Sequence, residues 1–428
     1  MEVVLLKHNV CYEKTERIRM MKRIRPDYYD KFTCIASRCP ISCCQEWKIA
    51  VDDETNRRWK KLLPPAATVP QKKNLSAYTM IKCKDRVIEL TERQLCPFLD
   101  QDGLCSLVIE YGDQVLSDTC ATFPREIHRY GAHEEEALLP CCPAVIDLLW
   151  EEQSLDFLES VQRKLDETEM KSETEKALFL IRKNMIHRME DNESSAEELL
   201  LNEFYIVREL YSEMEKWESG QDNTGSEKEK QCAKKIQQLT EAYFSEENVR
   251  ELSEAIQNID GDVLATMEER NELLQDLAVN YRREGLYQSV LEPLCGKAEE
   301  LSAQYDIQQM EEAMQRFENA YRQYEPFMKK FLMNEFLLNL ILPGSDLESF
   351  MIQLQWISLK YSVIKHGIFL RWLMNGKQEL AYEDVREIVV VICRMTGYEE
   401  EDIYEYLENS FEELIWDWGY LHLIIGSK

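Results

Sequence analysis

A dense group of cysteines near the N-terminus is the feature that most constrains how this chain can fold. The stretch FTCIASRCPISCCQEWKIAVDD, residues 32–53, places four cysteines within eleven positions. Ten of the fourteen cysteines lie between residues 34 and 142. They are Cys34, Cys39, Cys43, Cys44, Cys83, Cys96, Cys105, Cys120, Cys141 and Cys142. The fold must pair these thiols, bury them or bind something with them.

Disulfide pairing is disfavoured by the sequence that precedes the cysteines. The segment MEVVLLKHNVCYEKTERIRMMKRIRP has only a short apolar patch and lacks the longer apolar core and cleavage site of a secretory signal. We therefore expect a cytoplasmic protein, in which thiols stay reduced. No run of about 18 or more uncharged apolar residues occurs, so no membrane span is expected.

The acidic charge of the protein is confined to its second part. Residues 1–150 contain 22 basic and 22 acidic residues, whereas residues 151–428 contain 29 basic and 58 acidic residues. A surface of this kind repels polyanions, so a nucleic-acid partner is not expected. The excess is typical of a solvated acidic surface, and it can also attract lysine-bearing segments.

Long amphipathic helices are predicted from about Asp147 onward. In two places apolar residues recur at alternating spacings of four and three, which puts them on one helical face. The first stripe is Leu200, Phe204, Val207, Tyr211 and Met214. The second stripe is Met314, Phe317, Tyr321, Tyr324 and Met328. Both stripes are predicted to be core seams.

Two polar segments interrupt these helices. ESGQDNTGSEKEK, residues 218–230, reads as an exposed loop and offers a point of subdivision. LPGSD, residues 342–346, predicts a turn with Ser345 or Asp346 as the N-cap of the next helix. The predicted fold is mainly α: an irregular, cysteine-rich, metal-binding domain over 1–150, followed by an all-helical domain over 151–428.

Metal binding accounts for the cysteine groups better than inert burial does. Cysteine is a good small core residue, and we expect Cys232, Cys295 and Cys393 to be buried in that way. Thiolate-rich sites select zinc or iron–sulfur clusters. The adjacent pair Cys43 and Cys44 fits a zinc knuckle awkwardly, whereas a cluster takes about four thiolates from anywhere in a fold. If the pair is extended, its sulfurs face apart and serve different centres.

The order of the motifs resembles a known family. YYDKFTCIASRCPISCCQEWKIAVDD, CPFLDQDGLCSL, LSDTCATFPREIH and LLPCCPAVIDLL resemble the cysteine-rich region of flagellin lysine-N-methylases, the FliB-like family, and more loosely zinc- or iron-chelating domains. The similarity spans roughly residues 26–150. It implies metal ligation by Cys34, Cys39, Cys43, Cys44, Cys96, Cys105, Cys120 and Cys142. Cys83 and Cys141 fall outside the matched pattern.

The resemblance implies a protein-lysine N-methyltransferase that acts on flagellin, with S-adenosylmethionine as methyl donor and an iron–sulfur cluster, of the 4Fe–4S type, in the enzyme. No G-x-G-x-x-G follows a predicted strand. Cys39 and Cys43 begin a C-x3-C-x2-C run, but Glu46 stands where the third cysteine belongs. We therefore expect a donor site of another kind. Arg125 can donate to cluster sulfur or to an anionic ligand, with an ordinary salt bridge as the alternative; no catalytic residue is singled out.

Two other functions stay open at this point. One is a zinc-stabilised protein-interaction module without catalysis, with the helical region as the binding part. The other is iron–sulfur redox sensing, with Cys83 or Cys141 as reactive thiols.

For His128 and His133, exposure in a polar loop is expected rather than metal ligation.

Overall fold

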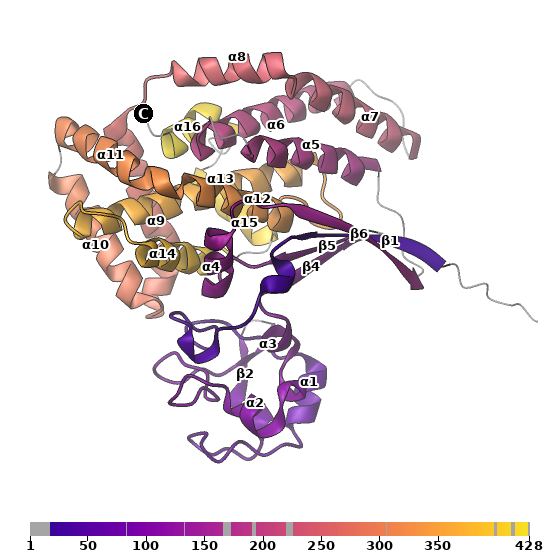
Figure 1. The fold of residues 1–428 in the computed structure, drawn as a ribbon, viewed down its shortest axis with the longest axis vertical. Helices are drawn as coiled ribbons and strands as arrows, with labels where there is room; N and C mark the ends of the chain where they lie inside the picture. The colour runs from indigo at the N-terminus through magenta and orange to yellow at the C-terminus, as the bar shows by residue number, and fades with distance from the viewer. Residues whose placement is uncertain are drawn as a thin grey trace, which may run out of the picture.

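A helical body, a sheet along one flank and a smaller irregular lobe make up the protein in our computed structural model (Figure 1). The structure describes residues 18–82, 84–131, 133–165, 173–190, 194–219, 226–304, 306–397, 400–411 and 416–426. Cys83 lies outside this range. The mainly α prediction is confirmed. Within the described residues, no helix combines the length and apolar character needed to cross a membrane.

The sheet joins the two halves of the chain. Its four strands, in spatial order, are β4 (Arg125–Tyr130), β5 (His133–Leu138), β1 (Ile18–Pro26) and β6 (Phe157–Leu165). β1 runs parallel to β5 and antiparallel to β6, so that Ile24 lies between Glu135 and Glu159. The region after residue 150 is therefore not all helical, because β6 completes a sheet begun by β1.

A second, smaller core marks the cysteine-rich lobe. It is formed by Ile49, Val51, Trp59, Leu75, Tyr78, Ile88, Cys96, Phe98, Leu107 and Val115. The main core, in contrast, joins Tyr28, Leu138 and Val145 to the helices of the body. The separate core thus covers only about residues 49–115 of the predicted domain 1–150. The boundary predicted after residue 150 falls inside the main core, because the flanking segments pack on the helices.

The lobe contains short elements connected by irregular loops. They are α1 (Asp53–Trp59), β2 (Thr79–Lys82), β3 (Asp85–Ile88), α2 (Ser106–Tyr111) and α3 (Asp118–Thr122). β2 and β3 form an antiparallel hairpin. Asp52 caps α1 by accepting a hydrogen bond from the amide of Thr55.

The body is built around α13 (Leu347–Met374), which is buried on nearly all sides. The other helices of the body are α4 (Pro143–Glu151), α5 (Glu173–Met189), α6 (Ala196–Ser219), α7 (Ser226–Tyr243), α8 (Glu246–Gln257), α9 (Val263–Arg283), α10 (Gln288–Gln304), α11 (Ile307–Tyr321), α12 (Glu325–Asn339), α14 (Tyr382–Met395), α15 (Glu400–Phe411) and α16 (Trp418–Ile425). Helices α6, α9, α10, α12, α14, α15 and α16 all contact α13. One central helix therefore organises the body.

Both predicted apolar stripes lie in the main core. The first lies on α6. The second is divided between α11 and α12 by a 3₁₀ turn at Arg322–Tyr324, because Pro326 has no amide hydrogen and fits the first turn of a new helix. The predicted cap is confirmed at Asp346, whose carboxylate accepts from the Ser349 amide at 2.9 Å. The predicted loop 218–230 is helical at both ends, because α6 extends to Ser219 and α7 begins at Ser226. Since α7 packs against α5 and α6, this segment does not divide the body.

Candidate functional site

The adjacent cysteines Cys43 and Cys44 occupy the two central positions of a tight turn. The amide of Gln45 closes the turn by donating to the carbonyl oxygen of Ser42 at 3.3 Å. The expectation that their sulfurs face apart is wrong, because the backbone turns here instead of being extended, and the two thiols hydrogen-bond to each other. The pair can therefore present two sulfurs to neighbouring centres.

Four of the matched cysteines form a set around the core of the lobe. Cys44, Cys105 and Cys120 pack against that core, and Cys96 is part of it. The thiol of Cys44 hydrogen-bonds to Cys96 and lies within electrostatic range of Cys105. Cys105 and Cys120 are within range of each other and also of Cys43. The amide of Cys96 also donates to the carbonyl of Cys44 at 2.7 Å, which ties two motifs fifty residues apart. We call these four residues the lobe set.

The other four matched cysteines lie where the lobe meets the body. Cys39 is within electrostatic range of Cys34 and Cys43, and Cys142 is within range of Cys39 and Cys43. Cys142 is the residue that precedes α4, so this junction set, as we name it, is anchored to the body through that helix. All eight matched cysteines thus gather around the Cys43–Cys44 turn.

Burial controls the protonation of these thiols. It raises the pKa of Cys120 to about 11 and that of Cys142 to about 12. The pKa of Cys43 is raised by the hydrogen bond that its thiol donates to Cys44, and then by burial. The pKa of Cys44 is lowered by that bond but is raised more by the bond to Cys96 and by burial. In the folded chain alone these groups are neutral thiols, and a coordinated metal would deprotonate them.

Thiols are the donors that zinc and iron–sulfur clusters take, and eight of them gather in this region. Within the described residues, however, no three His, Cys, Asp or Glu side chains are arranged to hold a single metal ion.

Cys141 is a different case: it is 5% exposed, and burial raises its pKa to about 12. Such a thiol is unreactive at neutral pH, which argues against Cys141 as a redox sensor.

One arginine of the body holds the loop that carries Cys39, Cys43 and Cys44, which we call the cysteine loop. Arg394, at the end of α14, donates from Nε to the carbonyl of Cys141 (3.1 Å), from Nη1 to that of Ser42 (3.2 Å) and from Nη2 to that of Ile41 (2.8 Å). Its guanidinium also lies 5.1 Å from the ring of Trp47. The side chain is 5% exposed. No sequence signal pointed to this residue, which lies some 350 positions from the loop.

A second contact holds the same loop against the body. The amide of Tyr287 donates to the carboxylate of Glu46 at 2.7 Å, and the Tyr287 hydroxyl donates to the Glu46 carbonyl at 2.6 Å. Glu46 is the residue found where a standard C-x3-C-x2-C run would have its third cysteine. Its side chain is engaged in fixing the loop.

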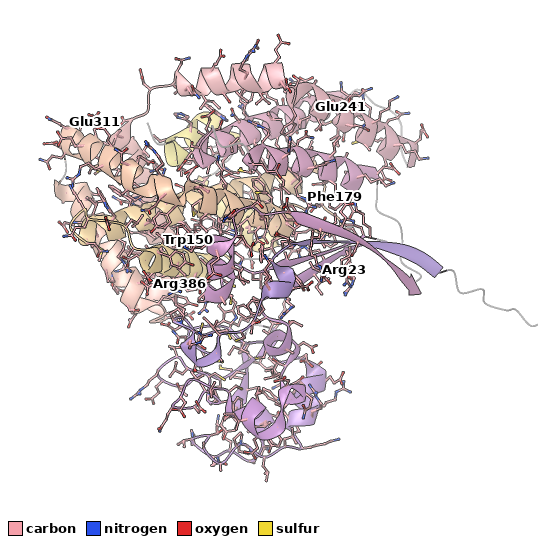
Figure 2. The ribbon with its side chains drawn as sticks, viewed as in Figure 1. Arg23, Trp150, Phe179, Glu241, Glu311 and Arg386 are labelled. Carbon is pink, nitrogen blue, oxygen red and sulfur yellow. The ribbon has the colours of Figure 1, made fainter. Side chains whose placement is uncertain are left out.

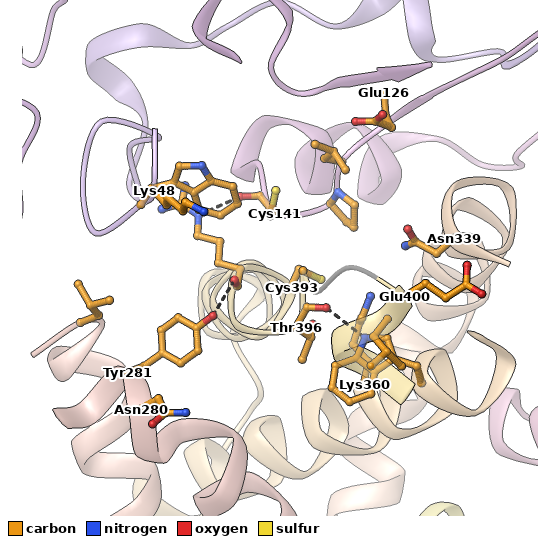
Figure 3. A pocket seen from close by; sticks show the side chains of 18 of the residues that line it. Lys48, Glu126, Cys141, Asn280, Tyr281, Asn339, Lys360, Cys393, Thr396 and Glu400 are labelled. Carbon is orange, nitrogen blue, oxygen red and sulfur yellow. Dashed lines mark hydrogen bonds between the residues drawn. The ribbon is translucent and has the colours of Figure 1, made fainter. Parts of the chain in front are cut away.

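Beside these contacts lies a cleft of about 1900 Å³ between lobe and body (Figure 3). The lobe contributes Trp47 and Lys48, and β4 contributes Glu126 and His128. The body contributes residues from α9, α12, α13, α14 and α15, so the cleft exists only in the assembled fold. Cys141, the neighbour of Cys142 in the junction set, also lines the cleft.

A buried ion pair forms part of the cleft wall. Lys360 Nζ lies 2.7 Å from Glu335 Oε2, and the two side chains are 6% and 1% exposed. The same oxygen accepts from Asn339 Nδ2 at 3.0 Å. Burial lowers the pKa of Lys360, but Glu335 outweighs this and leaves the pKa raised, so the amine is cationic. Cys393, a buried thiol as expected, lies within electrostatic range of the pair.

The structure places the remaining predicted residues on strands. The Arg125 guanidinium lies over the rings of Tyr29 (5.8 Å) and Phe32 (5.1 Å), an aromatic contact rather than the salt bridge weighed as the alternative; its contact with a cluster or an anionic ligand stays a prediction. His128 is half-buried, and burial lowers its pKa. His133 is buried, with Nε2 2.7 Å from a Glu135 oxygen. The expectation of two exposed loop histidines is wrong, because both belong to the β4–β5 hairpin.

Comparison with known proteins gives three relevant similarities. Residues 182–424 match the FliB lysine N-methylase C-terminal domain. A lysine-N-methylase of Salmonella typhimurium is 31% identical over 127 residues, which is 28% of this chain and 30% of that protein. The flagellar biosynthetic protein FliU of Salmonella muenchen is 33% identical over 129 residues, 28% of this chain and 72% of that protein. No solved structure matches.

The fold and site define a class: a mainly α protein in which a thiol-rich lobe is clamped beside an open cleft. The family match covers more than half of the chain, and it spans the helices that carry Arg394, Glu335 and Lys360. This protein therefore belongs to the FliB lysine N-methylase family. The match confirms the resemblance first seen in the cysteine motifs, although it does not include those motifs. The chain spans about a third of the length of the lysine-N-methylase relatives.

Proposed function

We propose that this protein is a protein-lysine N-methyltransferase that acts on flagellin, with S-adenosylmethionine as the methyl donor. The proposal is carried by membership of the FliB family together with its similarity to proteins named Lysine-N-methylase. The relative named as a flagellar biosynthetic protein supports flagellin as the substrate. The donor and the substrate come from the family resemblance rather than from a recognisable nucleotide-binding motif.

Methyl transfer makes specific demands on the protein. The bond from the sulfonium sulfur to the methyl carbon breaks, and a bond from that carbon to the lysine nitrogen forms. A free lysine side chain has a pKa of about 10.4, so it must lose a proton before its nitrogen can attack. A site that excludes water and places positive charge nearby favours the neutral amine. The wall of the cleft beside the cysteine loop contains one such charge, the buried ammonium of Lys360, which is paired with Glu335.

We propose that the cysteines hold iron–sulfur clusters, with the lobe set and the junction set each supplying four thiolates. Four is the number of cysteines that one cluster takes. When bound, such a cluster supplies one-electron chemistry. The chain's own part is to hold the sulfurs in place: α4 anchors Cys142, and Arg394 holds the loop that carries Cys39, Cys43 and Cys44.

The test of function is mass spectrometry of flagellin. Flagellin from cells with the gene should carry methyl-lysine, and flagellin from a deletion strain should not. Unmethylated flagellin incubated with the purified protein, S-adenosylmethionine and a reductant should gain methyl groups, and omission of the donor should prevent this. Identical lysine methylation in both strains would rule out the proposed activity.

Metal analysis separates the enzyme from a zinc-stabilised interaction module. Protein purified without oxygen should be brown and should contain iron and acid-labile sulfide. Cys96→Ser and Cys142→Ser, one from each set, should each lower the iron content in part, since each leaves the other set intact. A colourless protein that holds zinc without sulfide would support the interaction module instead.

A further inference from the structure

We infer that the cleft receives a lysine side chain of the substrate protein and that the Glu335–Lys360 pair positions its amine. This inference rests on the proposed function, because it names the site at which that function would act. It concerns residues of α12 and α13, which lie far in sequence from the cysteine motifs.

The pair is unusual because it is almost fully buried and yet lines a cavity. A buried ion pair costs several kcal/mol of desolvation per ion, and well-packed apolar residues are often no worse for stability. A charged pair in the wall of a cleft is therefore a candidate functional site. Both hydrogen bonds that Glu335 accepts, from Lys360 and Asn339, end on Oε2. Its Oε1 accepts from no donor among the described residues and is available to a ligand.

The charges around the cleft favour a cationic ligand. Its basic side chains are mostly engaged: Lys82 pairs with Glu284, Lys360 pairs with Glu335, and Arg394 bonds to carbonyls. Several carboxylates of the lining have no lysine or arginine ion pair among the described residues. They are Glu126, Asp346, Glu348, Glu400 and Glu401. A lysine-bearing segment entering the cleft would therefore meet a net negative field.

The walls suit the aliphatic stem of a lysine as well as its charge. Trp47, Tyr281 and Trp356 line the cleft, and the last two are held by hydrogen bonds to backbone carbonyls at the end of α14. Aromatic faces accept both methylene groups and ammonium groups. Figure 3 shows Tyr281 and Lys360 on opposite sides of the end of α14, with Cys141 and Cys393 nearby.

The pair also favours the reactive form of the incoming amine. Glu335 Oε1 can accept a hydrogen bond from the amine, while the Lys360 ammonium disfavours a second positive charge at short range. The hydrogen bond to Glu335 orients the nitrogen, and the Lys360 ammonium opposes its protonation. Glu335 and Lys360 are positioning residues in this scheme, and the transferred methyl group does not touch them.

The experiment uses a pair of fluorescent peptides that share a Gly/Ser frame. One carries a single lysine and the other carries norleucine, which has an uncharged side chain, at the same position. The full-length metal-loaded protein should bind the lysine peptide more tightly. Glu335→Gln combined with Lys360→Met removes both charges together and should lower affinity for the lysine peptide about tenfold. Glu311→Gln, on an exposed face of α11, is the matched control (Figure 2).

Binding of S-adenosylmethionine is measured on the same proteins and should not change in the double variant. Hydrogen exchange of the wild type gives an independent reading that does not depend on variants folding: the lysine peptide should protect α12 and α13 near the pair, and the norleucine peptide should not. Equal binding of both peptides by the wild type, or unchanged lysine preference in the double variant, would overturn the inference. Loss of donor binding with lysine preference intact would also overturn it. Failure of flagellin methylation alone would count against the proposed function only.

Discussion

Removal of the Arg394 side chain tests whether the cysteine loop is held by the body. In Arg394→Met the aliphatic stem is largely kept, but the three hydrogen bonds to the carbonyls of Ile41, Ser42 and Cys141 are lost. The body should stay folded, because the substitution lies at the end of α14. The loop should then open more often than in the wild type.

The size of the effect follows from the contacts. A hydrogen bond from a charged donor contributes about 1.5–3 kcal/mol, and a cation–π contact contributes about 1 kcal/mol. The losses are not additive, and the Ser42 carbonyl can regain water. We therefore expect local opening to become easier by about 4 kcal/mol, which is roughly a thousandfold in the opening equilibrium. Arg394→Lys should recover part of this, since an ammonium group cannot reach all three carbonyls at once.

Native-state hydrogen exchange measures this opening directly. Amides in residues 38–47 should exchange about a thousandfold faster in Arg394→Met, whereas amides in the middle of α13 should be unchanged. Arg386→Met is the control on the same helix: Arg386 bonds to the partly exposed Asp147 and should contribute about 1 kcal/mol or less (Figure 2). Exchange within threefold of the wild type in residues 38–47 of Arg394→Met would refute the clamp.

Three further outcomes are expected. Burial raises the pKa of Glu203 to about 8, and neither of its oxygens has a hydrogen-bond partner among the described residues. Its contribution to stability is therefore present below a pH of about 4.5 and is lost as the pH rises through about 8. In urea unfolding, the stability of Glu203→Gln relative to the wild type should rise by roughly 3–4 kcal/mol between pH 5 and pH 8. Burial raises the pKa of Glu135, but Arg182 outweighs this and lowers the pKa to about 2. The stability that Glu135 contributes above about pH 4.5 is therefore lost as the pH falls towards 2. Glu135→Gln should remove about 3 kcal/mol from the loss of stability that the wild type shows over this pH range. Cys44→Ser should lower bound iron, and Cys232→Ser should not; equal iron in both would contradict the lobe set as ligands.

The local features of this fold could be predicted because their causes are local. The stripes of α6, α11 and α12 follow from a spacing of three and four residues, and the cap at Asp346 follows from one side chain beside a turn. Even the break between α11 and α12 has a local cause in Pro326. For these elements a short window of sequence contains the whole explanation.

The Cys43–Cys44 turn shows where local reasoning fails. Alternation of side chains holds only for an extended backbone, and the hydrogen bond from Gln45 to Ser42 makes a turn instead. Ser42 supports this turn locally, because its Oγ accepts a hydrogen bond from the Cys44 amide at 3.1 Å. The flanking residues are also held by Arg394 and Tyr287, which belong to the body.

The sequence by itself determined that the chain is mainly helical, that its N-terminal third is rich in thiols, and that its motifs resemble the FliB-like family. Only the tertiary structure decided which cysteines neighbour one another, that β6 completes the sheet of β1, and that Glu335 and Lys360 meet at a cleft. The reason is physical: helices and caps arise from neighbours along the chain, whereas the clamp, the cleft and the ion pair arise from groups on separate elements that meet only when the core excludes water.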